Sequence, residues 1–595
     1  MKLAIAALAV PLLVAAAGTS PDAFEQRVSR MIESATRAAS PPDASKGGYG
    51  EIAANLKLGR NLEWCSRRLE KLLEAEPSGD MFWMFPTTSI AYLGRDKLTP
   101  AAKHALRRSW KTYMPYRGDT ENHWLLYYTS LYLMTQLYPG EPGDAWFTGK
   151  SSAENFRESD EYLKSWMELT VTRGQGEYDC THYIGVYLLP LSYLAAWSDD
   201  PEMRLRARMM LDWIIADYAV ESLDGIFAGA HARTDDVQVL EKWHGVSSDF
   251  GWLLFELGRP LPNFDSYSLF YCLAAAYQPP EVIRLIATDR SKPYLHRELK
   301  RTRHRWRFTD VRNAPVYKTM YMTRDYAVGS DQGGILQPIQ QHSWDITWRV
   351  PDPRGVRNTI FSMHPYSSTY ELQMYFTGMP DFITESVVRS KRTYDSPDKF
   401  LGGSPYEKIS QDHGTVIALY DIPPGTRFPH INGFFPSDLT RFEEDASGWI
   451  FAQGGSAYIA YRPLAPYEWR PVEGGGRRLY SPHLKNGTIL QAASAGDYAS
   501  FEAFRRAVLA LPLEVKMEPT PAVRFRTLRG RDIEFTYGET PVVAGTKVDY
   551  GAWKMFDGPF MQSDAGSRRL VLSHGSLRRV IDFNTLKVTD SVETR

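Results

Sequence analysis

Two aromatic stretches decide the fold, WLLYY at residues 124–128 and YLLPL at residues 187–191. Each lies in a segment of helical periodicity and is apolar on more than one helix face, which is typical of a helix buried from both sides. An inner ring of helices inside an outer ring provides such burial. Similar periodicity fills residues 25–290, with proline and capping signals between segments 51–73, 100–113, 121–137, 160–172, 179–197, 201–218, 235–255 and 267–277. We therefore expect an (α/α) toroid, an incomplete barrel, over residues 21–295.

The second half has a different texture, which predicts an antiparallel β-sandwich over residues 296–595. Short alternating runs separated by Gly, Pro, Asn and Asp are typical of strands, and no helical segments intervene. The runs are 317–322, 344–350, 371–376, 415–420, 449–451, 457–461, 523–528 and 569–572. The halves join at the basic stretch 300–307, which is interpreted as a solvated linker or, alternatively, as a contact for a polyanion.

The N-terminus predicts export. Lys2 precedes an uncharged apolar run that ends in small residues at 15–18, so residues 1–20 have the features of a secretory signal peptide. Later segments lack the roughly 20 apolar residues that span a bilayer. We therefore expect a periplasmic or secreted protein that is not inserted in a membrane.

Charge and cysteine content exclude several classes of partner and site. The formal net charge of -1 gives no overall basic field for nucleic acid, so an anionic ligand must meet a local patch. Three cysteines are too few for a disulfide framework or a cysteine-based zinc site. Dinucleotide-binding, phosphate-loop, zinc-protease and serine-hydrolase motifs do not occur, and no cofactor or metal is expected.

Asn122 and His123 begin one aromatic helix, and His182 and Tyr183 begin another. The positive end of the first helix dipole favours an anion, so this position suits a carboxylate ligand. If both helices enter the ring from the same rim, the two pairs face one cleft. The alternatives are that Asn122 is a helix-start residue, His123 a satisfied core residue and Tyr183 a packed aromatic residue.

These two motifs, Asn122-His123 and His182-Tyr183, resemble those of alginate lyases with an α/α toroid. With the β half, the chain is similar to heparinase II/III-like polysaccharide lyases, although the longer family signature around either pair is missing. The resemblance implies that Asn122 neutralises a uronate carboxylate while His123 and Tyr183 transfer protons. The expected partner is an anionic polysaccharide or oligosaccharide.

The chemistry of β-elimination explains why such residues would be needed. The C5 proton of a 4-linked uronate becomes acidic only when the charge of its carboxylate is neutralised, and one preorganised donor contributes on the order of 3 kcal/mol. An imidazole with a pKa of about 6.5 accepts a proton at neutral pH, whereas a phenol with a pKa of about 10 donates one. His123 is therefore the expected base and Tyr183 the expected acid, with Tyr183 in both roles as an alternative.

A third cluster, GAHARTDD at residues 229–236, offers further ligands. Arg233 is suited to grip a sugar carboxylate through two hydrogen bonds, and His231 to assist it. The alternative is a loop in which Asp235 caps the next helix. Expected substrate contacts from the aromatic helices are His182, Tyr187 and Trp124.

The leading function is thus an exported polysaccharide lyase. One alternative is a glycoside hydrolase on a similar toroid, with its acid and base drawn from Glu121, Asp179, Asp235, Asp236 and Glu241. The second alternative is a non-catalytic glycan-binding protein that keeps the aromatic cleft.

Overall fold

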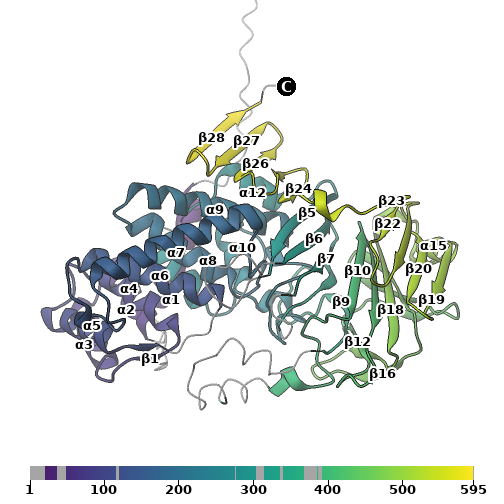
Figure 1. Ribbon diagram of the computed structural model, residues 1–595, viewed down its shortest axis with the longest axis horizontal. Coiled ribbons are helices and arrows are strands. Elements are labelled where there is room, and N and C mark those ends of the chain that lie inside the picture. The colour runs from purple at the N-terminus through teal and green to yellow at the C-terminus, as the bar shows by residue number, and fades with distance from the viewer. Residues whose placement is uncertain are drawn as a thin grey trace, which may run out of the picture.

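The N-terminal region of the computed structural model is helical (Figure 1). The structure describes residues 21–36, 48–115, 120–274, 277–302, 314–335, 340–366, 385 and 392–593. The helices of this region are α1 (Pro21–Ala35), α2 (Tyr49–Leu58), α3 (Leu62–Leu72), α4 (Met84–Leu93), α5 (Pro100–Thr112), α6 (Glu121–Leu137), α7 (Ser152–Arg173), α8 (Ile184–Trp197), α9 (Pro201–Glu221), α10 (Ser247–Phe255), α11 (Ser266–Leu273) and α12 (Glu281–Thr288). Short turns η1 (Met81–Trp83), η2 (Gly143–Ala145) and η3 (Lys242–His244) and strand pairs β1 (Ser78–Gly79) with β2 (Met114–Pro115) and β3 (Ser222–Leu223) with β4 (Ile226–Phe227) connect them.

Local backbone chemistry explains where helix boundaries differ from the predicted ones. The predicted helix 51–73 is two helices, because Gly59 adopts φ 68° after α2 and Asn61 adopts φ 49° before α3. α7 begins eight residues earlier than predicted, at Ser152 rather than 160, since Ser151 and Glu154 form a capping box. α8 begins at Ile184, after Asp179 with φ 46°. Asp235 accepts hydrogen bonds from Val237 and Gln238 in a turn, so the predicted helix 235–255 reduces to η3 and α10.

The C-terminal region consists of antiparallel sheets. Within the described residues, one sheet has the order β16-β17-β12-β9-β8-β7-β6-β5-β24-β25-β26-β27-β28, a second β10-β11-β18-β15-β14-β13 and a third β19-β20-β21-β22-β23. The strands are β5 (Tyr294–Arg301), β6 (Pro315–Met322), β7 (Tyr326–Gly333), β8 (Trp344–Trp348), β9 (Thr359–Met363), β10 (Glu407–Asp412), β11 (Thr415–Asp421), β12 (Ile431–Phe435), β13 (Arg441–Glu444), β14 (Ile450–Gly454), β15 (Ala457–Pro463), β16 (Glu468–Pro471), β17 (Arg477–Ser481), β18 (Lys485–Ser494), β19 (Leu513–Lys516), β20 (Ala522–Arg526), β21 (Asp532–Thr536), β22 (Val542–Val543), β23 (Thr546–Lys547), β24 (Phe556–Asp557), β25 (Met561–Ser563), β26 (Arg569–His574), β27 (Leu577–Asp582) and β28 (Lys587–Val592). Helix α15 (Phe501–Leu509) and turns η5 (Arg392–Asp395), η6 (Ala495–Asp497) and η7 (Tyr550–Ala552) lie among them.

Alternation along the strands explains how these sheets stack. In β11, Val416 and Ala418 enter a core shared with β7, β8, β9 and β12 of the first sheet. Ile417 and Leu419 point the other way, into a core shared with α15, β20 and β21. The second sheet is therefore a middle layer, apolar on both faces.

The first sheet also reaches the helices. Its last strands, β26 to β28, lie beside α12 in Figure 1, and Leu570, Leu572 and Ile581 belong to the main helical core. All three cysteines are buried with free thiols. Among the described residues, no helix combines the length and apolar character needed to cross a membrane.

The predicted order, helices first and antiparallel strands second, is confirmed. The helical region ends with α12, and β5 begins at Tyr294. The predicted signal peptide at 1–20 and the predicted strand 371–376 lie outside the described residues.

The prediction of a solvated linker at 300–307 is wrong for its first two residues. Lys300 and Arg301 belong to β5, and their side chains are buried in ion pairs with acidic residues of the helical region. A buried cation requires such partners, which the linker interpretation did not provide.

Candidate functional site

The first turn of α6 holds Asn122 and His123. Asn122 is fully buried, and its backbone N–H and Nδ2 both donate to Glu177 Oε2, at 3.0 and 2.7 Å. Its Nδ2 also donates to Thr120 Oγ1 at 3.1 Å. The anion expected at this helix start is therefore Glu177 of the protein itself, which satisfies an otherwise unpaired backbone donor.

Glu177 connects this turn to Arg233 and Tyr183. Arg233 Nη1 donates to Glu177 Oε1 at 2.8 Å, and Arg233 Nη2 to the Tyr183 hydroxyl at 3.3 Å. The Arg233 guanidinium also lies 4.5 Å from the centre of the Tyr183 ring. Gln340, which follows β7, accepts from Arg233 Nη2 at 2.8 Å. Asn122, Glu177, Arg233 and Tyr183 thus form one chain of polar contacts, with an anchor from the C-terminal region.

The environment of Tyr183 favours a proton donor. Its side chain is half-buried, and burial raises the pKa of its hydroxyl to about 12, against the opposing effect of Arg233. The phenol is therefore protonated at neutral pH. Because the Arg233 charge stabilises the phenolate, the proton is easier to give up than burial alone would allow.

An aromatic path joins His123 to the same tyrosine. The His123 ring packs 5.0 Å from Phe82, and His123 Nδ1 shares a hydrogen bond with the Thr120 hydroxyl. Tyr267 lies 5.9 Å from Phe82 and 5.4 Å from His182, whose ring is 5.3 Å from Tyr183. His123 and Tyr183 are therefore linked by a series of tilted and edge-on ring contacts as well as through the polar chain.

Tyr187 and Trp124, which the sequence predicts as substrate contacts, are both buried. Tyr187 is fully buried, and its hydroxyl donates to Glu121 Oε2 at 3.2 Å and to Glu177 Oε2 at 3.4 Å. Trp124 is 6% exposed and packs against Tyr127 and Tyr128. Tyr187 thus helps to position the Glu121 and Glu177 carboxylates, whereas Trp124 packs among the rings of α6, and neither presents an open ring face.

His231 lies apart from the other predicted residues. It is fully buried, with Nδ1 bonded to the Asp179 carbonyl at 2.8 Å and Nε2 to Lys242 Nζ at 3.0 Å. Burial, and then the neighbouring Lys242, lowers its pKa well below the ordinary value, so the ring is neutral. Both ring nitrogens of His231 are therefore occupied, and the side chain has no exposed atom.

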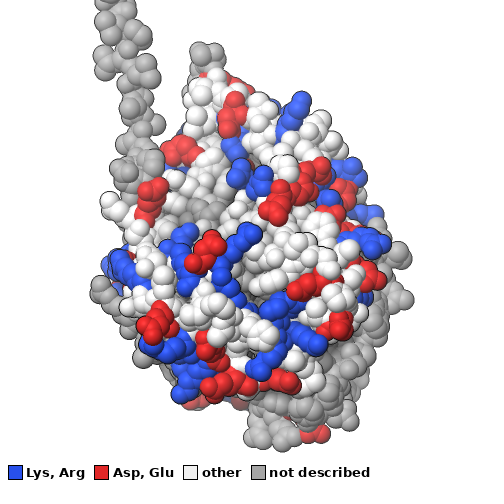
Figure 2. All heavy atoms as spheres, turned by 90° about the vertical axis from the view of Figure 1, so that its left-hand side faces the viewer, with Lys and Arg blue, Asp and Glu red and all other residues white. Residues whose placement is uncertain are grey.

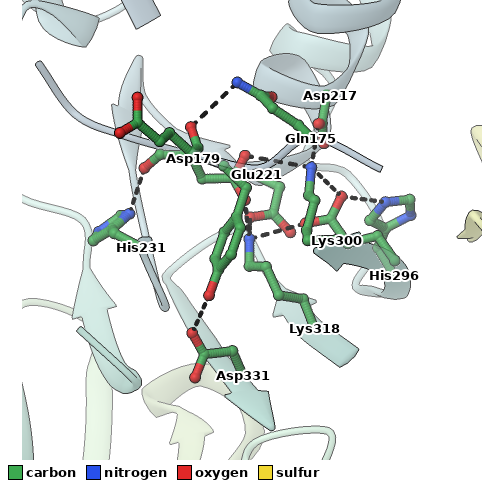
Figure 3. Close-up of polar contacts among 12 residues, drawn as sticks. Gln175, Asp179, Asp217, Glu221, His231, His296, Lys300, Lys318 and Asp331 are labelled. Atoms are coloured by element: carbon green, nitrogen blue, oxygen red, sulfur yellow. Dashed lines mark hydrogen bonds and ion pairs between the residues drawn. The ribbon is translucent and has the colours of Figure 1, made fainter. Parts of the chain in front are cut away.

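A buried charge cluster consists of Asp179, Asp217, Glu221, Glu298, Lys300 and Lys318 (Figure 3). Lys318 Nζ contacts Asp179, Glu221 and Glu298, the last at 2.9 Å. Lys300 Nζ contacts Asp217, Glu298 at 3.2 Å and Asp179 at 3.6 Å. Asp179 opens the segment that carries Tyr183, so this cluster fixes that segment to β5 and β6.

Shifted pKa values of the acidic residues reduce the net negative charge of the cluster. Burial, followed by repulsion from Glu298, raises the pKa of Asp217 and of Glu221 well above the usual values. Against the effect of burial, Lys300 and Lys318 hold the pKa of Glu298 well below its usual value. Asp217 and Glu221 therefore favour the protonated form, whereas the Glu298 anion faces both ammonium groups. Asp179, Asp217 and Glu298 are spaced closely enough to share a cation, and the Lys300 ammonium contacts all three.

Three of the positioning residues went unnoticed in the sequence. Glu177 stands in the stretch GQGEYD at 174–179, directly before the residues singled out, and its partner Asn122 lies 55 positions away. The basic run around Lys300 predicts a solvated linker or a polyanion contact, not the buried ion pairs that Lys300 forms. Gln340 carries no local signal, because a single glutamine in a β-rich region resembles any surface residue.

Comparisons with known proteins give no assignment: no protein-family model matches the chain, and no curated protein matches it.

Proposed function

We propose that this chain is an exported polysaccharide lyase that cleaves a uronate-containing chain by β-elimination. The observation that carries the proposal is the half-buried Tyr183 hydroxyl 3.3 Å from Arg233 Nη2, a protonated phenol beside a fixed cation. Acidic and basic side chains are interspersed over the face of the helical region in Figure 2, so attraction of an acidic sugar depends on such local cations.

In the proposed reaction, His123 removes the C5 proton, the C4–O4 bond breaks as the C4–C5 double bond forms, and Tyr183 protonates the departing O4. The scheme requires the His123 tautomer that carries its proton on Nδ1, in the hydrogen bond with the Thr120 hydroxyl, and its lone pair on Nε2. In the alternative scheme, Tyr183 acts as both base and acid.

The electrostatic role moves from Asn122 to Arg233 in this proposal. Asn122 Nδ2 already donates to Glu177 and Thr120, whereas the Arg233 guanidinium lies against the proton donor itself. A fixed cation aimed at the enolate-like charge supplies on the order of 3 kcal/mol. Asn122 is a positioning residue in this scheme, because it holds the Glu177 carboxylate that orients Arg233.

The proposal includes the finer architecture that the sequence suggested. The helices would form an (α/α) toroid whose inner ring includes α6 and α8, and the two large sheets would form an antiparallel β-sandwich. The burial of α6 and α8 on all sides supports the first assignment, and the core that the two sheets share supports the second.

The glycoside hydrolase alternative has less support. Glu121 is buried against Arg301 and the Trp166 indole, and Asp179 contacts two lysines. Asp235 caps a turn, and Glu241 pairs with Arg357 at 3.4 Å. These four carboxylates are therefore committed to structural partners.

The test is an ultraviolet assay with alginate, glucuronan, heparin-type and chondroitin-type chains. A new C=C conjugated to the carboxylate absorbs, whereas hydrolysis yields reducing ends without this absorbance. We expect absorbance with one acidic polymer and its loss, by at least 100-fold, in Tyr183→Phe with unchanged circular dichroism. Tyr498→Phe, at a half-buried tyrosine between β18 and α15, is the matched control. Full activity of Tyr183→Phe rejects the role of the phenol, and binding without either product indicates a binding protein.

A further inference from the structure

A cavity lies within the C-terminal region, on the face of the first sheet opposite the charge cluster. Its volume is about 360 Å³, within the range of sites for small ligands. Strands β5, β6, β7 and β10, the β22–β23 hairpin and η7 line it. Lys318 in β6 points to the helices and the charge cluster, whereas its neighbours Tyr317 and Thr319 line this cavity. A ligand here would not touch the candidate catalytic residues.

Three aromatic rings form one wall of this cavity. Tyr317 and Tyr550 have ring centres 4.6 Å apart, and Trp553 lies 5.6 Å from Tyr317 and 5.5 Å from Tyr550. Trp553 Nε1 donates to the Glu298 carbonyl at 3.0 Å, so the indole is fixed by its edge. All three rings are half-buried and in contact with the cavity. Rigid aromatic rings at a polar opening are suited to stack on the faces of sugar rings.

The cavity lining carries four cations, Arg297, Arg531, Lys547 and Lys554, and three carboxylates, Asp412, Asp549 and Asp557, an excess of one positive charge. Arg297 lies 5.4 Å over the Trp553 ring. None of the ion pairs between described residues includes Arg297 or Lys547, although Asp557 is the cross-strand neighbour of Arg297. Arg531, by contrast, pairs with Asp412 at 3.0 Å. Arg297 and Lys547 are thus the cations that a carboxylate would meet beside the aromatic wall.

We propose that this cavity is a second, non-catalytic site that binds a short segment of an acidic oligosaccharide. Aromatic faces would take the sugar rings, and Arg297 and Lys547 would take the carboxylates or sulfates. The site goes beyond the proposed lyase function, since it needs no bond cleavage. In a lyase, it would hold the polymer on the enzyme between cleavage events and raise the effective concentration of substrate.

The experiment is isothermal titration calorimetry of the full chain carrying Tyr183→Phe, which stops turnover during the titration. The probes are tetrasaccharides of alginate, heparin-type and chondroitin-type chains, with maltotetraose as the neutral counterpart. We expect one acidic probe to bind, and Trp553→Ala and Arg297→Gln each to weaken that binding at least tenfold. Arg324→Gln, at an exposed arginine in the β6–β7 turn, is the matched control and should leave binding unchanged.

The outcomes separate this inference from the lyase proposal. Binding that is unaffected by Arg297→Gln and Trp553→Ala, binding of maltotetraose with equal affinity, or no acidic probe bound overturns the second site, whatever the ultraviolet assay gives. Binding that depends on these two residues supports the site even if no polymer is cleaved. Trp553 packs against Tyr317 and Tyr550, so its removal can disturb folding. If Trp553→Ala does not fold, the binding of Arg297→Gln decides the result.

Discussion

At the scale of single residues, Arg233 is the group on which the candidate site depends most. Its planar guanidinium holds Glu177 through Nη1 and both Gln340 and Tyr183 through Nη2, a fixed geometry over two nitrogens that the single nitrogen of an ammonium group does not reproduce. We expect Arg233→Lys to keep the fold and to lower turnover roughly 100-fold, about 3 kcal/mol of transition-state stabilisation. Steady-state rates at saturating polymer check this, with Arg324→Lys as the control. A rate close to the wild-type value would remove Arg233 from the mechanism.

The variant Asn122→Ala distinguishes two roles for Asn122, direct binding of the substrate carboxylate and positioning of Glu177. If it only holds Glu177, we expect Asn122→Ala to reduce turnover about tenfold, far less than Tyr183→Phe, and to cost about 1–3 kcal/mol of stability because Glu177 loses buried hydrogen bonds. Asn155→Ala is the matched control, since Asn155 is also buried and donates to the Lys150 carbonyl at 2.8 Å. Complete loss of turnover in Asn122→Ala, with binding retained, would instead restore it as the carboxylate ligand.

At the scale of helices and strands, the charge cluster between α9 and strands β5 and β6 predicts a pH dependence. The folded pKa of Glu221 is raised, so the native state holds a proton that the unfolded chain releases, and stability falls as pH rises above the unfolded value. Glu221→Gln resembles the protonated form and avoids this cost. We expect its stability relative to wild type to increase with pH from about 4.5 upward, by at most about 1.4 kcal/mol per pH unit.

Denaturant unfolding at several pH values between 5 and 9 measures this difference. Glu298→Gln is the opposite control, because the folded pKa of Glu298 is lowered and its anion faces Lys300 and Lys318. That variant should be destabilised over the same range. A Glu221→Gln difference that does not change with pH would mean that Glu221 is ionised in the folded protein.

Sequence patterns predicted elements better than they predicted partners. The bounds of α6 follow directly from its periodicity and agree with the structure, and so does the strand 415–420 within β11. The apolar periodicity continues across Gly59 and across the segment before Ile184, so it did not reveal that α2 ends at Gly59 or that α8 begins only after Asp179. Glu177 and Gln340 could not be assigned, since their roles come from contacts 55 and 107 positions along the chain, and sequence spacing carries no record of such contacts.

At the scale of the whole molecule, the two regions depend on each other for buried charge. Asp179, Asp217 and Glu221 belong to the helical region, whereas their cations Lys300 and Lys318 belong to β5 and β6. Glu121 likewise pairs with Arg301. Removing the C-terminal region breaks the buried pairs of Glu121 with Arg301 and of Asp179 with Lys318, a cost of about 3–5 kcal/mol for each broken pair.

We therefore expect the full chain to unfold in one calorimetric transition, and a fragment of residues 21–295 to lack a cooperative transition of its own. The fragment carrying Glu121→Gln tests the cause, since it removes a buried carboxylate that has lost Arg301 and should recover part of the soluble yield. Two separate transitions in the full chain, one matching the isolated fragment, would show that the helical region folds without the lysines of β5 and β6. In that case the cluster would only fasten two independent domains, and Tyr183 and Arg233 would keep their geometry without the C-terminal region.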